Sequence, residues 1–208
     1  MSPLACITCG PACEPIDKVR RITNFSTGEI GTILTGAFLR AGHEVVCFRS
    51  EAATFPGPAG ADVRPFSTND SLAAGLRSLE RPPAVVLHAA ALCDFVLESI
   101  EGAEGSGKID SRAGTIRLTL GPAEKILPQI RAWFPSARII GWKFEVDGPR
   151  EQALARAAAQ IRDARTDACV LNGAAYGPGF GLLAPDNSLQ HFPDKTALAA
   201  HLAAHVCA

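Results

Sequence analysis

Residues 9–31 combine the residue types that could hold a phosphate group. They join a strand predicted at 4–8 to a helix predicted to begin at Ser26-Thr-Gly-Glu29. Free backbone N–H groups and the helix dipole favour an anion at such a helix start. A strand-to-helix loop of about 17 residues is also too long to serve only as a connection. The segment therefore predicts phosphate binding, although Ser26 and Glu29 could instead form an ordinary capping box on a decorated loop.

Other motifs that carry chemistry are missing or weak. No Gly-x-Gly-x-x-Gly follows the first strand, and there is no Gly-Lys-Ser or Gly-Lys-Thr phosphate loop. Cys6 and Cys9 have zinc-ligand spacing, but Cys6 should lie inside a strand and no second pair follows. His201 and His205 lie four residues apart, which is typical of a solvated helix face. The sequence therefore predicts no metal ligands.

The elements that must position the phosphate loop alternate between strand and helix. Strands are predicted at 4–8, 44–48, 63–66, 84–88, 115–120, 138–144, 168–171 and 188–192, and helices at 26–41, 70–80, 123–134, 149–164 and 195–206. This order predicts an α/β fold: a Rossmann-like, mainly parallel sheet with helices on both faces. We expect a single domain over residues 1–208, with two smaller domains as the second interpretation.

Ligands of such a sheet bind beyond the carboxyl ends of its strands, at a switch point in the strand order. The loops expected to matter are therefore 9–25, 89–114, 121–125, 142–145 and 172–181.

The composition excludes several classes of protein. Lys and Arg number 20 and Asp and Glu 21, a net charge of −1, so no basic field exists to hold nucleic acid or an anionic membrane. Apolar residues make up 47% and charged residues 20%, which excludes a disordered chain. Apolar runs are far shorter than the roughly 20 residues of a membrane span. Seven cysteines, four of them inside apolar runs, and the lack of a signal-like start predict a reduced, cytoplasmic protein.

One long motif resembles a known family. The stretch Glu14-Pro-Ile-Asp-x-Val-Arg-x-Ile-Thr-Asn-x-Ser-Thr-Gly-x-x-Gly31 is similar to the signature of the phosphopantothenate–cysteine ligases, also called phosphopantothenoylcysteine synthetases, which form the ligase domain of DNA/pantothenate metabolism flavoproteins. Shorter matches follow in the family's order: Ala89-Ala-Ala-Leu-Cys-Asp94, Lys108-Ile109, Pro122-Ala-Glu-Lys-Ile-Leu127, Gly141-Trp-Lys-Phe-Glu145 and Val170-Leu-Asn172. The resemblance covers nearly the whole chain.

The resemblance implies a two-step reaction in coenzyme A synthesis. The carboxylate of 4′-phosphopantothenate attacks the α-phosphate of CTP, or of ATP in eukaryotic-type members, with Mg²⁺ assisting. Cysteine then displaces the nucleotide from the acyl intermediate. The resemblance also implies a homodimer. No flavin is expected, because the chain starts at about the first strand of the ligase and the decarboxylase found ahead of many bacterial relatives is absent.

The resemblance further implies which residues form the site. Asn24 would hold the acyl intermediate, and Lys108 would reach it from a flap at about 96–114, whose part from 98 onward is polar and Gly-rich. The implied nucleotide- and substrate-binding residues are Gly10, Pro11, Ser26, Thr27, Gly28, Ala90, Asp94, Pro122, Ala123, Glu124, Lys125, Trp142 and Lys143.

Simpler explanations exist for four of these assignments. Asn24 could form a turn, Lys108 could be a solvated lysine on a disordered surface loop, Asp94 could cap a helix, and Trp142 could belong to the core.

The chain departs from the family pattern in places that bear on nucleotide choice. It reads Gly10-Pro-Ala-Cys-Glu-Pro where members often have Gly-Gly-Thr-x-Glu-Pro, and Lys108-Ile-Asp-Ser replaces a run of lysines. Gln160 and Ala164 stand where bacterial CTP users have lysines, although Lys125 and Lys143 could supply that charge. We therefore expect a relaxed preference, with CTP favoured only modestly over ATP or with ATP accepted outright.

Two other functions stay open. One is a diverged nucleotide-binding relative without ligase activity. The other is a short Rossmann-type nicotinamide-dependent reductase. The missing glycine fingerprint counts against the reductase, as does the missing Tyr-x-x-x-Lys, since Tyr176 is followed by Phe180 at that spacing.

Overall fold

The computed structural model describes residues 2–102, 107–110, 112 and 114–205 of the 208-residue chain. The strands within these residues are β1 (Leu4–Cys9), β2 (Cys13–Pro15), β3 (Arg21–Thr23), β4 (Glu44–Ser50), β5 (Asp62–Phe66), β6 (Val85–His88), β7 (Phe95–Glu101), β8 (Arg117–Pro122), β9 (Arg138–Phe144), β10 (Ala168–Asn172), β11 (Phe180–Leu183) and β12 (Leu189–Phe192). The helices are α1 (Glu29–Arg40), α2 (Asn69–Arg77), α3 (Ile126–Trp133), α4 (Arg150–Ala164) and α5 (Lys195–His205).

An eight-stranded sheet forms the body of the protein, in the order β12-β11-β10-β9-β6-β1-β4-β5. The strands from β5 through β10 in this order run parallel, whereas β11 is antiparallel to both β10 and β12. The strand order reverses direction between β1 and β6, which is the switch point of a Rossmann-like sheet. The predicted fold class is therefore confirmed.

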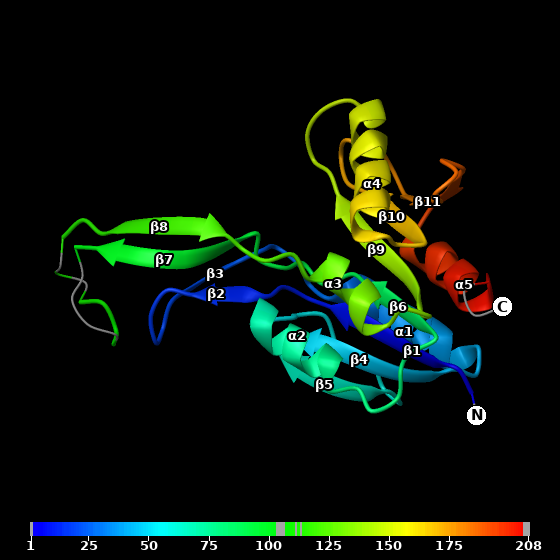
Figure 1. Cartoon of the computed structure of the whole chain (residues 1–208), viewed down its shortest axis with the longest axis horizontal. Helices are drawn as coiled ribbons and strands as arrows, with labels where there is room; N and C mark the ends of the chain where they lie inside the picture. Colours follow the sequence, from blue (N-terminus) through cyan, green and yellow to red (C-terminus); the bar gives the residue numbers. More distant parts are fainter. Residues whose placement is uncertain (1, 103–106, 111, 113, 206–208) are drawn as a thin grey trace.

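The central strands are buried on both faces, which explains their nearly unbroken apolar sequences. Successive side chains of a strand point to opposite faces. Ala5 and Ile7 of β1 join the core under α1 and α5, whereas Cys6 joins the core under α2 and α3. Helix α4 covers β9 and β10 through its small residues, including Ala153 and Ala157 (Figure 1).

Helix α1 begins later than the sequence suggests. Its first residue is Glu29, and Gly28 precedes it with φ of 80° and no side-chain cap. The capping box expected from Ser26 and Glu29 is therefore wrong, because Glu29 turns away and forms an ion pair with Lys195 at the start of α5. A capping box does exist at α2, where Thr68 and Ser71 bond reciprocally.

Two antiparallel hairpins, β2–β3 and β7–β8, lie outside the main sheet and project from it as arms (Figure 1). The strand predicted at 115–120 is β8, and it pairs with β7 rather than with the main sheet. Strand β7 covers 95–101, so the first part of the flap expected at 96–114 is a regular strand, and the flap itself stays a prediction. Residues 103–106, 111 and 113 of the expected flap lie outside the described residues.

The described residues also bear on the expectations about cysteines, membrane spans and metal ligands. The six cysteines within them are all free and buried: Cys6, Cys9, Cys13, Cys47, Cys93 and Cys169. Four of these, Cys6, Cys47, Cys93 and Cys169, are the ones whose apolar runs predict burial. No helix in this part of the chain is both long and apolar enough to cross a membrane. In the same residues, no group of three or more His, Cys, Asp or Glu side chains could hold a metal ion.

The close packing of α1 on β1 gives a stability prediction. A Cβ added at Gly31 would lie 2.1 Å from Cys9 Cβ, whereas one at Gly36 would meet only the flexible end of Arg40, at 3.2 Å. Alanine raises helix propensity at both positions by about 1 kcal/mol, but overpacking at Gly31 costs about 1–3 kcal/mol. Urea unfolding should therefore show that Gly36→Ala is neutral or stabilising and that Gly31→Ala is destabilising. Equal effects of the two substitutions would contradict the close contact.

Candidate functional site

The loops that follow β1 and β6 lie side by side at the switch point. Pro11 and Ala91 form an isolated parallel bridge beyond the strand ends. Ala91 N–H donates to the Gly10 carbonyl at 3.0 Å, and Ala12 N–H donates to the Ala91 carbonyl at 2.9 Å. The pairing of the two strands thus continues into the loops. It brings together Gly10, Pro11 and the backbone next to Ala90, three of the residues predicted for the site.

A buried polar pair lies beneath these loops. His88 Nδ1 and Thr8 Oγ1 are 2.9 Å apart, and the Thr8 hydroxyl also accepts the Ala90 N–H at 3.3 Å. Burial lowers the pKa of His88 to about 4, so the ring is neutral at pH 7. The sequence analysis gave this histidine no role. The available signal was that Thr8 and His88 are the last residues of the two apolar strands predicted at 4–8 and 84–88, and they are partners in the register of the sheet.

The start of α1 comes against the loop after β1. Gly10 and Gly28 have φ of 86° and 80°, and a Cβ on Gly28 would lie 3.6 Å from Gly10 Cα. A Cβ on either glycine would lie 2.9 Å from Ala53 Cβ. Gly10, Thr27 and Gly28 are therefore gathered at the helix start, where backbone N–H groups and the dipole favour an anion. Ser26 precedes them as a partly buried residue.

An acidic side chain stands at the same helix start. Glu29 is the first residue of α1, and its carboxylate pairs with Lys195. The lysine offsets a negative charge that would otherwise oppose a bound phosphate. Sequence reasoning missed Lys195, because no local pattern connects residues 166 positions apart.

Asn24 and Asp94 are linked through the loop after β6. Asn24 is exposed, yet its Nδ2 donates to the Leu92 carbonyl at 2.7 Å. Cys93, which follows Leu92, is fixed by Asn69: Asn69 Nδ2 donates to the Cys93 carbonyl at 2.8 Å, and Asn69 Oδ1 accepts the Cys93 N–H at 3.1 Å. The structure thus gives Asn24 a tertiary contact with the loop after β6, so a local turn does not account for its side chain.

The segment before α3 joins this group. Asp94 pairs with Lys125, and the Asp94 carbonyl accepts the Ala123 N–H at 2.9 Å. Lys125 is the N-cap of α3, and no side chain bonds to the free N–H groups there. The alternative of Asp94 as a helix cap is therefore wrong. The loop at 122–125, which contains Pro122, Ala123, Glu124 and Lys125, lies beside Asp94, as the site prediction requires.

Trp142 and Lys143 make their contacts elsewhere: Trp142 with the core and Lys143 with Glu145. Trp142 is partly buried and packs against the core under α1 and α5, which favours the core interpretation. Lys143 Nζ lies 3.5 Å from a carboxylate oxygen of Glu145, a buried residue that also pairs with Arg156. Among the described residues, no hydrogen bond or ion pair joins Trp142 or Lys143 to the group around Asp94.

Lys108 lies away from the other predicted residues. It is exposed, and the next residue, Ile109, is held by the turn of the β2–β3 hairpin. Asn24 follows the opposite end of β3, at the base of that hairpin. Lys108 therefore lies next to the turn of the β2–β3 hairpin, whereas Asn24 lies at the base of that hairpin.

The carboxylate that holds Ile109 has a strongly shifted pKa. Desolvation opposes the ionisation of Asp17, but backbone N–H donors of Val19, Ile109 and Arg20, together with the Arg20 side chain, lower its pKa to about 2. Asp17 is therefore a buried, ionised carboxylate at neutral pH, with an exposed side-chain fraction of 2%.

The two positions linked to nucleotide choice lie on α4. Gln160 Nε2 donates to Cys169 Sγ at 3.3 Å and lies against Gly141. Ala164 is buried at the last position of α4. Neither side chain carries a charge, and the expected relaxed preference between CTP and ATP stays a prediction.

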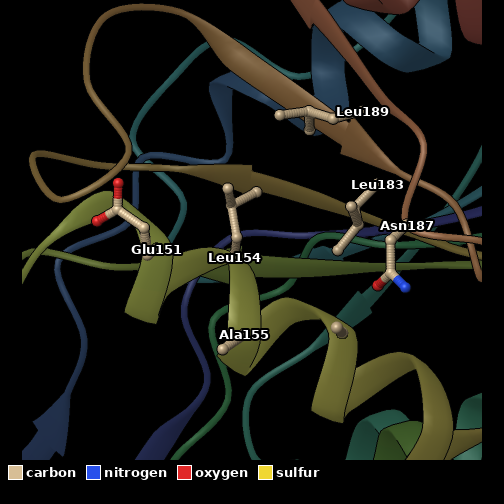
Figure 2. A pocket seen from close by; sticks show the side chains of 7 residues that line it. Glu151, Leu154, Ala155, Leu183, Asn187 and Leu189 are labelled. Carbon is tan, nitrogen blue, oxygen red and sulfur yellow. The ribbon is translucent and has the colours of Figure 1, made fainter.

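A separate hollow of about 320 Å³ lies between α4 and the β11–β12 hairpin (Figure 2). Its lining residues are Glu151, Leu154, Ala155, Ala158, Leu183, Asn187 and Leu189. None of them belongs to the predicted site.

Comparison with known proteins places this arrangement in a family. Residues 4–205 match the DNA/pantothenate metabolism flavoprotein C-terminal domain. The chain belongs to this family. The resemblance found in the sequence is thereby confirmed.

Individual relatives agree with this assignment. The coenzyme A biosynthesis bifunctional protein CoaBC of Mycobacterium bovis is 29% identical over 218 residues, covering 94% of this chain and 50% of its own length. The chain spans about half the length of the curated relatives it matches. In fold it is similar to the DNA/pantothenate metabolism flavoprotein of Streptococcus pneumoniae, with a TM-score of 0.84, 24% identity and 97% and 96% of the two chains covered. It is also similar to a Cab2 mutant in complex with phosphopantothenate-cysteine, with a TM-score of 0.74, 18% identity and 98% and 85% covered.

The glycines at the start of α1 give a prediction for phosphate binding. Gly42 has φ of 85° and open space around it, so Gly42→Ala costs only the left-handed backbone strain of about 1–2 kcal/mol. Gly28→Ala adds the contact with Ala53 and should lower the free energy of unfolding by roughly 1–3 kcal/mol more. We expect Gly28→Ala also to weaken pyrophosphate binding, measured by titration calorimetry, by about tenfold or more, or 1.4 kcal/mol. Unchanged pyrophosphate affinity in Gly28→Ala would remove this loop from the site.

Proposed function

We propose that the protein is a phosphopantothenate–cysteine ligase. The carboxylate of 4′-phosphopantothenate attacks the α-phosphate of CTP or ATP, pyrophosphate leaves, and the cysteine amine then displaces the nucleoside monophosphate. The observation that carries the proposal is the meeting of the long signature at 14–31 with the shorter match at 89–94 at the switch point, where Asn24 contacts the loop that leads to Asp94. Family membership and the fold shared with a Cab2 mutant in complex with phosphopantothenate-cysteine support it.

Each part of the arrangement meets a demand of this reaction. A carboxylate attacks a polyanion only if the phosphate charge is neutralised, and N–H groups at the starts of α1 and α3 can contribute to that. Gly10 and Gly28 let the backbone approach a phosphate closely. Lys125 adds a positive charge beside Asp94, which can accept a hydrogen bond from the nucleotide. We assign Asn24 to the acyl intermediate, because its amide lies between the two loops.

The co-substrates follow from the same chemistry. Mg²⁺ keeps several waters and is often bound largely through substrate phosphates, so we propose that it arrives with the nucleotide. We further propose that the enzyme is a cytoplasmic homodimer that acts only on small molecules, with no flavin of its own.

Pyrophosphate release tests the proposal directly. The protein is mixed with phosphopantothenate and cysteine, and with CTP or ATP in separate reactions and then at equal concentration together. We expect pyrophosphate and phosphopantothenoylcysteine only when all three substrates are present, and the monophosphate formed identifies the nucleotide used. Nucleotide binding without pyrophosphate release would favour the diverged binding relative, and a fluorescence change of NADPH on addition of protein would favour the reductase.

Asn24 gives a sharper prediction for the same assay. Asn24→Asp replaces an amide donor by a carboxylate beside the Leu92 carbonyl and an anionic intermediate. Turnover should fall by a factor of about 10² or more, with the unfolding transition little changed because Asn24 is exposed. Gln190→Glu makes the same change of charge on the exposed edge strand β12 and should leave turnover unchanged. Full turnover in Asn24→Asp would remove Asn24 from the site.

A further inference from the structure

The two arms are joined to each other at two points. Halfway along, the Leu97 N–H of β7 donates to Glu14 Oε1 of β2 at 2.9 Å. At the tip, the turn between β2 and β3 holds Ile109. The shorter β2–β3 hairpin thus supports the longer β7–β8 hairpin (Figure 1). It also holds Ile109 in the connection between β7 and β8.

The contact at the tip holds one residue from both sides. Asp17 Oδ2 accepts the Ile109 N–H at 3.1 Å, and both terminal nitrogens of Arg20 donate to the Ile109 carbonyl at 3.3 Å. Asp17 and Arg20 also form an ion pair with each other. We call Asp17, Arg20 and the Ile109 backbone the clamp.

The clamp is built into the hairpin rather than formed by chance at its surface. Asp17 Oδ1 accepts the N–H groups of Val19 and Arg20 at 2.8 and 2.7 Å, which fixes the carboxylate within its own turn. The side chain of Asp17 is 2% exposed, and the Ile109 residue is 7% exposed. Lys108 and Asp110, on either side of Ile109, are exposed.

We propose that Asp17 and Arg20 are positioning residues for Lys108. The Ile109 N–H belongs to the peptide group that contains the Lys108 carbonyl, so a bond to that N–H fixes the backbone from which the lysine extends. The Arg20 guanidinium fixes the following peptide group, and the Lys108 side chain is left free to meet an anion. This inference rests on the proposed ligase function, in which Lys108 contacts the acyl intermediate. Because the clamp holds Lys108 next to the turn of the β2–β3 hairpin, that contact lies away from the one proposed for Asn24 at the base of the hairpin.

The first measurement concerns the clamp itself and needs no substrate. Hydrogen exchange at the Ile109 amide, followed in the full chain, should accelerate at least tenfold in Asp17→Asn and Arg20→Lys. The asparagine loses the charge, and the lysine loses the two-pronged grip on the carbonyl. The matched control is Asp62→Asn, which breaks an exposed ion pair with Arg64 on β5 and should leave Ile109 unchanged. Unchanged exchange in both clamp variants would overturn the proposal.

The second measurement asks whether the clamp acts through Lys108. We expect Asp17→Asn and Arg20→Lys to lower kcat at least tenfold while the KM for the nucleotide stays within twofold. In a Lys108→Gln background, the same substitutions should cause no further loss, because the positioned group is already missing. An equal further loss in that background would show a merely structural role, and full turnover in the clamp variants with faster Ile109 exchange would show that Lys108 does not depend on the clamp. Both results overturn the proposal.

Failure of the ligase function gives a different result. A wild-type protein that releases no pyrophosphate overturns the proposed function, and with it the role given to Lys108, even if the Ile109 amide responds as expected. An active wild type whose clamp variants are also fully active overturns only the positioning role. Because Arg20 is partly exposed, Arg20→Lys keeps the test available if Asp17→Asn fails to fold.

Discussion

The site depends on the pairing of β1 with β6 beyond the ends of both strands. In a parallel sheet, two neighbouring strands normally separate where their connections leave for opposite faces. Here the backbone bonds between Gly10, Ala12 and Ala91 keep the loops together past that point. The loop after β1 leads through the β2–β3 arm to α1, and the loop after β6 leads to Asp94 and the β7–β8 arm. One short stretch of backbone pairing therefore sets the relative positions of both halves of the candidate site.

The buried pair of Thr8 and His88 supports that pairing from below. A neutral imidazole can exchange a hydrogen bond with a hydroxyl without the desolvation cost of a charge. The low pKa of His88 keeps the ring neutral at pH 7. The Thr8 hydroxyl can then accept the Ala90 N–H of the adjoining loop. The Thr8 hydroxyl and His88 Nδ1 are thus hydrogen-bonded without placing an ion under the site.

The body of the fold could be predicted from the sequence better than its arms, for a physical reason. Buried parallel strands such as β6 and β10 require unbroken apolar runs, which local sequence displays directly. The arms have no such requirement, because most residues of β7 are exposed and its partner β8 follows only after a long connection. The flap expected at 96–114 came from the family resemblance and from the polarity of its part from 98 onward, and that polarity does not distinguish a strand of an exposed hairpin from an irregular segment. The same limit explains why β2 and β3 were missed within the loop expected at 9–25.

For the site, sequence motifs identified the loops but not the contacts between them. Asn24 and Asp94 could be named because they belong to one signature and its companions, and the fold then brings their loops together. Lys195 and Asn69 leave no such local trace, because the groups to which they bond lie far away in the sequence. At Gln160 the motif indicates only that a lysine is missing, whereas the structure shows that the side chain contacts Cys169 and Gly141. A motif thus tells which residue types are present, whereas the direction in which a side chain points depends on packing that only the folded chain defines.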